Sequence, residues 1–217
     1  DQHFREQLRD SERGKDYLKK RGLVGETAAR YHLGYAPAGW DHALKKFGAT
    51  EAGRQALLTV GLVIERAQEG QRTQPPGFYD RFRDRVMFPI RDTRGRVVGF
   101  GGRILDQGEP KYLNSPETPL FHKGANLYCL DRAREAAAKN QPVIVSEGYM
   151  DVIALHGAGF TGAVAPLGTA LTEGQMAELW KLADEPFLCF DGDNAGRRAA
   201  QRAAEVAADR ATKFGLK

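Results

Sequence analysis

Strict alternation of strand-like and helix-like segments between residues 142 and 212 constrains the fold of this chain more than any other feature. Three short apolar runs, PVIVSE, GAVAPLG and PFLCFD, are each followed by a longer segment with helical periodicity. Strands connected through helices pair in parallel, with right-handed crossovers. The pattern therefore predicts an α/β lobe with a parallel sheet over residues 141–217.

The preceding part of the chain has a different pattern, which predicts an α+β lobe. Short helical segments broken by glycine and proline extend from about Phe4 to Ala49, and Thr50 to Val60 is predicted to be a further helix. Two strand-like runs, Arg85 to Arg91 and Arg96 to Leu105, are joined by DTRG, which is typical of a hairpin turn. Residues 66–78 are rich in Gly, Pro and Gln, so we expect a surface loop there.

Charge is divided unevenly between these two predicted domains, which we bound at residues 1–140 and 141–217. The first carries 25 Lys and Arg against 18 Asp and Glu, and the second carries 7 against 10, so their net charges are +7 and −3. This distribution suits a polyanion held beside an acidic, metal-binding centre. A solvated surface explains an imbalance of this size equally well.

Composition argues against a membrane or secreted protein. The chain has no run of eighteen apolar residues and no charged-then-apolar leader, so we expect a cytoplasmic protein without membrane contact. Cys129 and Cys189 have no Cys or His at zinc-ligand spacing and are predicted to be buried small hydrophobic residues. The first residue is Asp1 rather than Met, so we expect a fragment of a longer chain, with processing of the N-terminus as the alternative explanation.

Acidic residues follow two of the predicted strands where each strand ends. Glu147 ends PVIVSE, Asp151 comes four residues later, and Asp191 and Asp193 flank a glycine after PFLCF. The two aspartates are expected to point to the same side, because side chains alternate along an extended segment. If the strands are parallel neighbours, their ends face the crevice where open α/β sheets bind ligands. Three or four carboxylates are then expected to converge there.

Converging carboxylates repel one another, so the cluster predicts divalent cations, above all Mg²⁺ held by few carboxylates and several waters. Such ions serve phosphoryl chemistry. Two simpler explanations stay open: Asp193 also fits the N-cap of the last helix, and Asp151 fits a favourable acid in a helix's first turn.

A second group of candidate residues is basic. Arg81, Arg83 and Arg85 fall at period two, so in an extended chain they line one face. The opposite face is predicted to be apolar and consists of Phe82, Val86, Phe88 and Ile90. Guanidinium groups suit phosphate oxygens, with ion pairs to the neighbouring aspartates as the alternative explanation.

A short extended segment offers a further set of ligand-binding groups. Lys111, Tyr112 and Asn114 provide a cation, a stacking ring and an amide, which together could hold a nucleotide. GFGG ahead of Arg103 looks like a glycine-rich phosphate loop but lacks the spacing of known phosphate-binding turns. Turn chemistry for Asn114 and half-buried packing for Tyr112 are the alternative. Lys123 is a weaker candidate.

Several long motifs resemble bacterial DnaG-type DNA primases. SEGYMDVIAL, PLGTALT and CFDGDNAGRRAA are similar to the family's Toprim domain. YDRFRDRVMFPIRD, GRVVGFGGRIL and PKYLNSPETPLFHKG are similar to the core segment that precedes it. The resemblance covers most of residues 15–200. It implies a basic α+β core lobe followed by an α/β Toprim lobe with a Rossmann-like parallel sheet.

The resemblance also implies roles for individual residues. Glu147 matches the Toprim glutamate, a general acid/base or metal neighbour, and Asp191 and Asp193 match the pair that binds Mg²⁺ or Mn²⁺. Asp151 matches a further acidic position, which we include among the metal ligands. A basic nucleotide- and template-binding surface facing these acids is implied for Arg81, Arg83, Arg103, Lys111, Tyr112, Asn114 and Lys123.

The chain also departs from the family pattern. It ends before the Gly-x-Asp-Pro-Asp segment that supplies further acids, so we expect a truncated Toprim lobe and an incomplete metal site. The zinc-binding module and the region that contacts the replicative helicase are expected to lie outside this sequence. Binding of zinc and contacts with the helicase and with single-strand-binding protein are therefore expected only through regions that this sequence does not include. Pro166 stands where the family more often has Thr.

We thus expect the catalytic core of a DNA-dependent RNA primase, which joins ribonucleoside triphosphates on single-stranded DNA by metal-assisted nucleotidyl transfer. A Toprim-type nuclease would use similar acids to admit water, but the long basic first lobe argues against it. A D-x-D phosphatase usually has Thr or Val soon after the second Asp, where Asn194 stands here. A non-catalytic module binding nucleic acid or nucleotides through the Lys111 region would need no acidic cluster.

Overall fold

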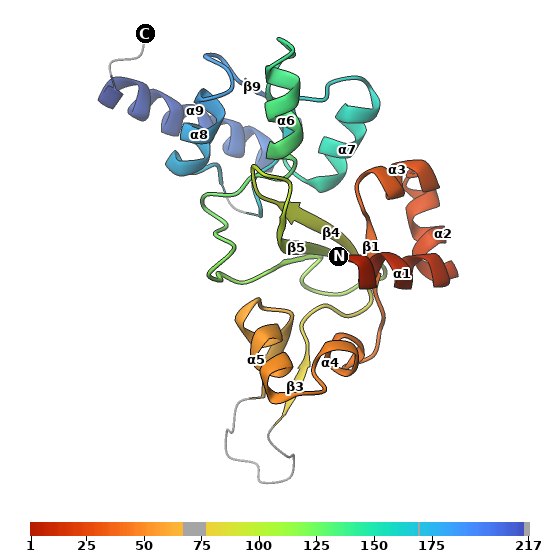
Figure 1. The fold of residues 1–217 in the computed structure, drawn as a ribbon. Helices are drawn as coiled ribbons and strands as arrows, with labels where there is room; N and C mark the ends of the chain where they lie inside the picture. Colours follow the sequence, from red (N-terminus) through yellow and green to blue (C-terminus); the bar gives the residue numbers. More distant parts are fainter. Residues whose placement is uncertain (67–76, 169, 215–217) are drawn as a thin grey trace. The chain divides into compact units, whose positions relative to one another are not determined.

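The computed structural model describes residues 1–66, 77–168 and 170–214, with side chains up to residue 209 (Figure 1). The chain divides into two compact units, residues 1–89 with 99–121 and residues 90–98 with 122–217. The tip of one hairpin thus belongs to the second unit. The domain boundary between residues 140 and 141 is a prediction from sequence patterns, and it stays a prediction.

Short helices supply much of the first unit. They are α1 (Gln2–Asp10), α2 (Glu12–Lys20), α3 (Gly25–Arg30), α4 (His42–Phe47) and α5 (Glu51–Thr59). Side-chain caps define two of the starts: the Ser11 hydroxyl accepts the N–H of Gly14, and the Thr50 hydroxyl accepts that of Gly53. Such a cap stabilises a helix by about 1 kcal/mol. The helix predicted from Thr50 is confirmed.

The other elements between residues 1 and 121 are antiparallel strands. They are β1 (Gly34–Ala36), β2 (Val63–Glu65), β3 (Phe78–Asp80), β4 (Arg85–Arg91), β5 (Val97–Ile104) and β6 (Tyr112–Asn114). One sheet has the order β1-β4-β5-β6, and β2 pairs with β3. The predicted hairpin is confirmed, with Asp92 Oδ1 accepting the N–H groups of Arg94 and Arg96 in its turn. The loop predicted at 66–78 falls mainly on residues 67–76, outside the described ones.

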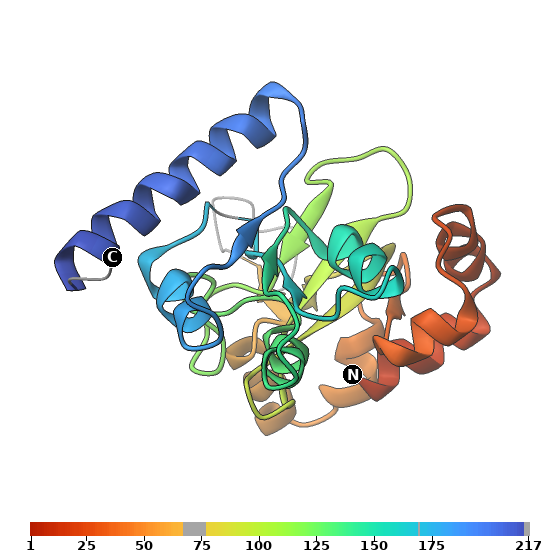
Figure 2. The same ribbon diagram turned by 90° about the horizontal axis from the view of Figure 1, so that it is seen from above.

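The second unit contains the predicted alternation of helices and strands. Its elements are α6 (Leu130–Ala137), β7 (Ile144–Val145), α7 (Tyr149–Gly157), β8 (Ala163–Val164), α8 (Glu173–Trp180), β9 (Phe187–Leu188) and α9 (Asn194–Phe214). The strands pair in parallel in the order β8-β7-β9, which confirms the predicted sheet. Figure 2 shows β9 leading through a short connection into α9.

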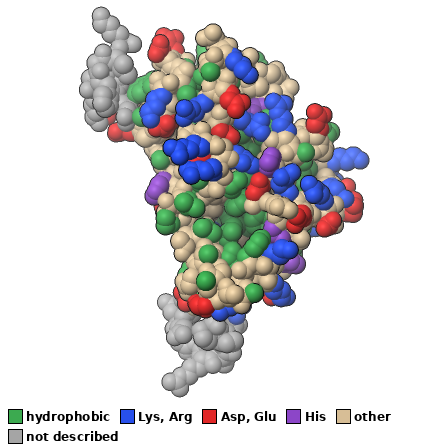
Figure 3. All heavy atoms as spheres, viewed as in Figure 1, with side chains coloured by type: hydrophobic (Ala, Val, Ile, Leu, Met, Phe, Trp, Pro, Cys, Tyr) green, Lys and Arg blue, Asp and Glu red, His purple; other side chains and the backbone are tan. Residues whose placement is uncertain are grey.

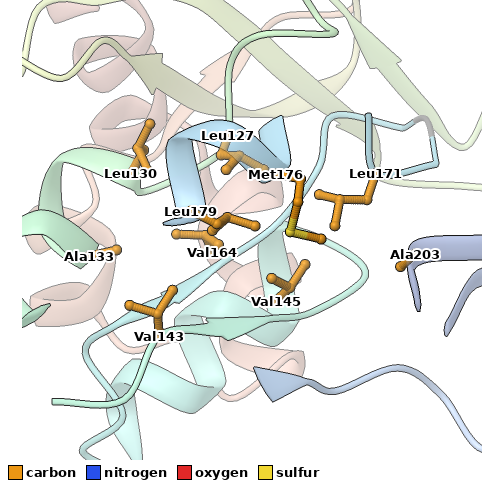
Figure 4. Close-up of a cluster of buried hydrophobic side chains, with 10 residues drawn as sticks. All are labelled: Leu127, Leu130, Ala133, Val143, Val145, Val164, Leu171, Met176, Leu179 and Ala203. Atoms are coloured by element: carbon orange, nitrogen blue, oxygen red, sulfur yellow. The ribbon is translucent and has the colours of Figure 1, made fainter. Parts of the chain in front are cut away.

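A buried hydrophobic cluster holds this parallel sheet against its helices (Figure 4). Its members are Leu127, Leu130, Ala133, Val143, Val145, Val164, Leu171, Met176, Leu179 and Ala203. Apolar residues three apart on α6 and on α8 fall on one face of each helix, which explains their helical periodicity in the sequence. Each buried large aliphatic side chain stabilises the fold by about 1.5–3 kcal/mol. The core thereby fixes the ends of β7 and β9, where the acidic residues lie.

The two cysteines differ in environment. Cys129 is buried as predicted, and burial raises the pKa of its thiol to about 12. The prediction for Cys189 is wrong, because this residue is exposed. Side chains alternate along β9 and the residues after it, so Leu188 packs against the core while Phe187 and Cys189 share the opposite, exposed face.

Surface properties agree only in part with the charge analysis. Lys and Arg side chains are interspersed with Asp and Glu on the face drawn in Figure 3, so no single basic stripe stands out there. In the part of the chain that the structure describes, no helix combines the length and the apolar character needed to cross a membrane.

Candidate active site

The ends of two neighbouring parallel strands bring acidic residues together in the second unit. β7 pairs with β9, and the chain continues from these strands to Glu147 and Asp191. The backbone N–H of Asp191 donates to Glu147 Oε1 over 2.9 Å. Strand pairing alone therefore places two residues that are 44 positions apart within one hydrogen bond.

Asp193 caps the helix that follows. Its Oδ1 accepts the N–H groups of Ala195 and Gly196, both at 2.8 Å, and its carbonyl accepts the N–H of Arg197. These bonds satisfy donors that the first turn of α9 would otherwise leave unpaired. The capping role that the sequence left open is therefore present, and it turns one carboxylate oxygen toward the helix.

Asp151 comes near the end of β7, since its Oδ2 would lie 3.5 Å from a Cβ built on Gly148, the residue after Glu147. It is an exposed residue in the first turn of α7. Among the described residues, no three His, Cys, Asp or Glu side chains are grouped closely enough to hold a metal ion. The expected convergence of three or four carboxylates is thus not seen. Carboxylate oxygens are still the donors that Mg²⁺ prefers, and Mg²⁺ binds through one or two of them with water at its other positions.

Gly196 is a site residue that the sequence analysis missed. A Cβ at this position would lie 2.1 Å from the carbonyl oxygen of Asp191 and 2.6 Å from Glu147 Oε1. Only glycine lets the first turn of α9 approach both residues. The available signal was a glycine in the first turn of an alanine-rich helix, where it lowers helix propensity without an evident local reason.

Gly196→Ala is therefore expected to destabilise the chain by about 1–3 kcal/mol, because the methyl group must displace backbone. Gly192→Ala is the matched control, since no atom lies within 4 Å of a Cβ built there. Thermal and urea unfolding of both variants measures the difference. Equal midpoints for the two variants would show that the close approach at Gly196 is not needed.

The predicted alternation of the arginine segment is wrong. Asp84 has a left-handed backbone with φ of 49°, which interrupts the extended chain before β4 begins at Arg85. Arg85 is buried and donates to the carbonyl oxygens of Gly102 and Pro110. A Cβ on Gly102 would meet both Phe82 and Arg85, so these two side chains share one side of the sheet.

The neighbouring aspartates do not pair with these arginines. Arg13 binds Asp84 at 2.7 Å and also contacts Asp106, and its hydrogen bond holds the pKa of the Asp84 carboxyl below its ordinary value. Asp80 is buried and accepts the backbone N–H groups of Ala43 and Leu44. The ion pairs proposed as the alternative for the arginines therefore do not account for them.

Arg83 instead stacks on aromatic rings. Its guanidinium carbon lies 4.1 Å from the ring centroid of Trp40 and 5.3 Å from that of Tyr79, and the two rings are 5.6 Å apart. Trp40 is 57% exposed. An exposed indole beside a guanidinium is a platform on which bases stack and to which phosphates bind. Sequence analysis missed Trp40 because it lies in a loop more than forty residues before the arginine segment.

A polar cavity of about 520 Å³ contains two other predicted residues, Arg103 and Lys111. Arg103 is buried, donates to the hydroxyls of Tyr17 and Tyr112, and stacks on the Tyr112 ring at 4.9 Å. Arg21 also lines the cavity, with its guanidinium 5.6 Å from the Tyr17 ring. Tyr17 and Arg21 come from α2 and its C-cap, so no sequence spacing connected them with Arg103.

The remaining predicted residues are held mainly through backbone groups. Arg81 is half-buried and donates to the carbonyl oxygen of Asn114 over 3.2 Å. Lys123 belongs to the second unit, where its carbonyl oxygen accepts from the buried amide of Gln175. Gln175 also closes a capping box with Thr172 at the start of α8, so this helix fixes the loop that carries Lys123.

Comparison with known proteins identifies two family models that match this chain. A family model described as "DNA primase catalytic core, N-terminal domain" matches residues 3–134, and a Toprim domain model matches residues 141–215. A DNA primase of Pseudomonas putida is 54% identical over 190 residues, which cover 88% of this chain and 28% of that protein. The Escherichia coli DNA primase is 50% identical over 193 residues, which cover 89% of this chain and 32% of that protein.

Solved structures show the same similarity. A DnaG primase catalytic domain bound to single-stranded DNA superposes with a TM-score of 0.84 at 45% identity, over 95% of this chain and 63% of that one. A DNA primase domain from Pseudomonas aeruginosa superposes with a TM-score of 0.81 at 52% identity, over 88% of this chain and 58% of that one. The chain spans about a third of the length of the curated relatives it matches.

Proposed function

The chain belongs to the DNA primase catalytic-core family, and from this premise we propose that it forms part of an enzyme that synthesises RNA primers on single-stranded DNA. The observation that carries the proposal is the hydrogen bond between Asp191 and Glu147 at the ends of adjacent strands in a Toprim domain. Bacterial primases as relatives support a role in the cytoplasm, at the replication fork.

The acidic strand ends would hold Mg²⁺ or Mn²⁺ through Glu147 and Asp191, which a hydrogen bond already brings together. Asp193 and Asp151 are assigned as further ligands that would turn toward the ion when it binds. A divalent ion there would lower the pKa of the attacking 3′-hydroxyl and screen the triphosphate. Glu147 Oε1 accepts the N–H of Asp191, which fixes the orientation of the carboxylate. We therefore assign Glu147 Oε2 as the oxygen that accepts the proton of the attacking 3′-hydroxyl. Attack on the α-phosphorus forms the new phosphodiester and releases pyrophosphate.

Nucleotide binding is assigned to the cavity that contains Arg103 and Lys111. A triphosphate carries several negative charges, and Lys111 and Arg21 line this cavity with exposed cations. The lining also contains Glu109 and Asp106, and Asp106 pairs with Arg13. Arg103 is held by two tyrosine hydroxyls, so it positions Tyr112 as a stacking ring rather than acting as a mobile cation. Lys123, which belongs to the second unit, stays a candidate for nucleotide or template binding separate from this cavity.

Template binding is assigned to Arg81, Arg83 and the Trp40 ring. The solved relative bound to single-stranded DNA supports this kind of partner. Stacking of a base on Trp40 and contact of a phosphate with Arg83 would need no base-specific hydrogen bond, which suits an enzyme that must read any template. Contacts with helicase and single-strand-binding protein are assigned to regions outside this sequence.

One observation favours a second candidate function. Because no three-acid group is present among the described residues, the chain by itself could bind template and nucleotide without joining nucleotides. Incorporation of labelled ribonucleotides on a single-stranded template, with Mg²⁺, with Mn²⁺ and with a chelator, separates the two. Metal-dependent RNA synthesis supports the primase proposal. Cleavage of the template, or binding without synthesis by any longer form of the protein, contradicts it.

Salt titration is expected to distinguish the two template contacts. The slope of log affinity against log salt is negative, and Arg83→Gln should make it less steep by about 0.7, the value for one phosphate contact on a single strand. Trp40→Ala should weaken binding at every salt concentration, by the roughly 1–3 kcal/mol of one stacked base, and leave the slope unchanged. Fluorescence anisotropy with labelled single-stranded DNA measures both. Equal slopes for Arg83→Gln and the unmodified chain would remove Arg83 from the phosphate contacts.

A further inference from the structure

An apolar groove with no assigned role lies in the first unit, between α1, α2 and α3. Its volume is about 460 Å³, which is in the range of binding pockets in general. Leu8, Leu18 and Leu33 are buried and line its floor, and Val24 stands at its edge with 61% exposure. A large aliphatic side chain exposed beside an apolar floor leaves hydrophobic area that a partner can cover.

The charged residues that line this groove all carry the same sign. They are Arg5 and Arg9 on α1 and Lys15 and Lys19 on α2. Each pair is spaced i, i+4, so its two cations lie on one side of the helix with Leu8 or Leu18 between them. Acidic residues of the same helices, such as Glu6 and Asp16, are not part of the lining.

Few of these cations are neutralised within the chain. Lys15 pairs with Glu12 in its own helix. For Arg5, Arg9 and Lys19, no ion pair is found within the described ranges. Like charges at i, i+4 destabilise a helix by about 0.2–0.5 kcal/mol per pair. The groove thus keeps an unfavourable excess of positive charge around an apolar floor.

We propose that this groove binds an acidic amphipathic helix of a partner protein. Apolar side chains on one face of that helix would cover Val24 and the floor, and Asp or Glu side chains beside them would pair with Arg5, Arg9 and Lys19. This arrangement is the helix-in-groove mode of peptide recognition. The proposal does not depend on primer synthesis, since no residue of the candidate active site lines the groove.

The lining favours a peptide over nucleic acid. Single strands bind to proteins through base stacking on aromatic rings together with phosphate contacts. No aromatic side chain is among the described residues that line this groove. Its floor is formed by leucine side chains, which phosphates would not approach. Charge and apolar character together therefore match an acidic peptide with hydrophobic anchors.

A synthetic helical peptide with leucines at i, i+3 and i+7 and glutamates beside them is the probe. A second peptide carries Gln in place of Glu, and a third carries Ser in place of Leu. Backbone amide NMR of the labelled chain maps each binding site, and fluorescence anisotropy gives each affinity. We expect the first peptide to shift signals of α1, α2 and α3 and to bind at least about fivefold more tightly than either control peptide.

Two variants test the groove without disturbing the core. Val24→Asp removes the apolar edge and adds a repelling charge, yet Asp is a favoured residue at the N-cap position that Val24 occupies, so α3 should persist. The double variant Arg5→Gln and Arg9→Gln removes two cations at similar volume. Both changes should lower the affinity for the first peptide at least about fivefold. Arg202→Gln, an exposed change on α9, is the matched control and should leave affinity unchanged.

Circular dichroism of each variant separates lost binding from lost folding. Loss of binding in folded Val24→Asp and in the folded double variant supports the proposal. It is overturned if millimolar peptide shifts no groove signal, if Val24→Asp binds as tightly as the unmodified chain, or if single-stranded DNA shifts the same signals and displaces the peptide. Failure of primer synthesis in any of these proteins would concern the proposed function and leave this test unaffected.

Discussion

Asp191→Asn is expected to lower nucleotide transfer at least about 100-fold in the longest form of the protein that synthesises primers, because loss of a ligand charge removes several kcal/mol of metal-dependent stabilisation. Binding of single-stranded DNA should stay unchanged or become slightly tighter, since one negative charge is removed. Primer synthesis and fluorescence anisotropy with the same template measure the two effects.

The matched control for this change is Asp184→Asn, an exposed aspartate seven residues earlier in the turn before β9. It should keep both activities. If Asp191 were only a structural residue at a strand end, Asp191→Asn would lower thermal stability and reduce binding and synthesis together. A folded Asp191→Asn protein that makes primers at nearly the normal rate would contradict the assignment.

Lys111→Ala is expected to act on nucleotide affinity instead. Removal of one charge-assisted contact to a triphosphate costs about 1.5–3 kcal/mol, so KM for the nucleotide should rise roughly 10- to 150-fold. High nucleotide concentration should recover much of the rate, because the metal ligands are untouched. Steady-state kinetics over a range of nucleotide concentrations measures this separation of KM from kcat.

Lys139→Ala provides the control, since it removes the same charge from an exposed position just after α6, outside the Lys111 cavity. Its kinetics should match those of the unmodified protein. An equal loss of kcat in Lys111→Ala at saturating nucleotide would place Lys111 in the chemical step, contrary to the assignment. An unchanged KM would remove it from the nucleotide site.

Local sequence signals predicted the parallel sheet correctly. Each strand of the second unit is a short apolar run, and each helix carries apolar residues at helical spacing, so period and order sufficed. The arginine segment shows where such reasoning fails. A single left-handed residue, Asp84, breaks the alternation that places Arg85 on the basic face. Nothing in the local pattern distinguishes that aspartate from one in an extended strand.

The candidate site divides in the same way. Glu147 and Asp191 were identified because each follows a strand, and strand pairing is the one long-range relation that the pattern predicts. Trp40 and Tyr17 were missed because their contacts with Arg83 and Arg103 depend on packing between segments far apart in the chain. Arg21 was missed because only this packing brings it to the cavity that Arg103 lines. Gly196 was missed because a close approach of backbone leaves no signature beyond the glycine itself.

The central claim, that the acidic strand ends of the second unit hold a divalent metal, is tested most directly by titrating the isotope-labelled chain with Mn²⁺. Paramagnetic broadening of amide signals falls steeply with distance from the ion. Broadening should appear first at Glu147, Asp191 and Asp193, and excess Mg²⁺ should reverse it. Broadening confined to exposed acids elsewhere, with these three signals unchanged, would contradict the claim.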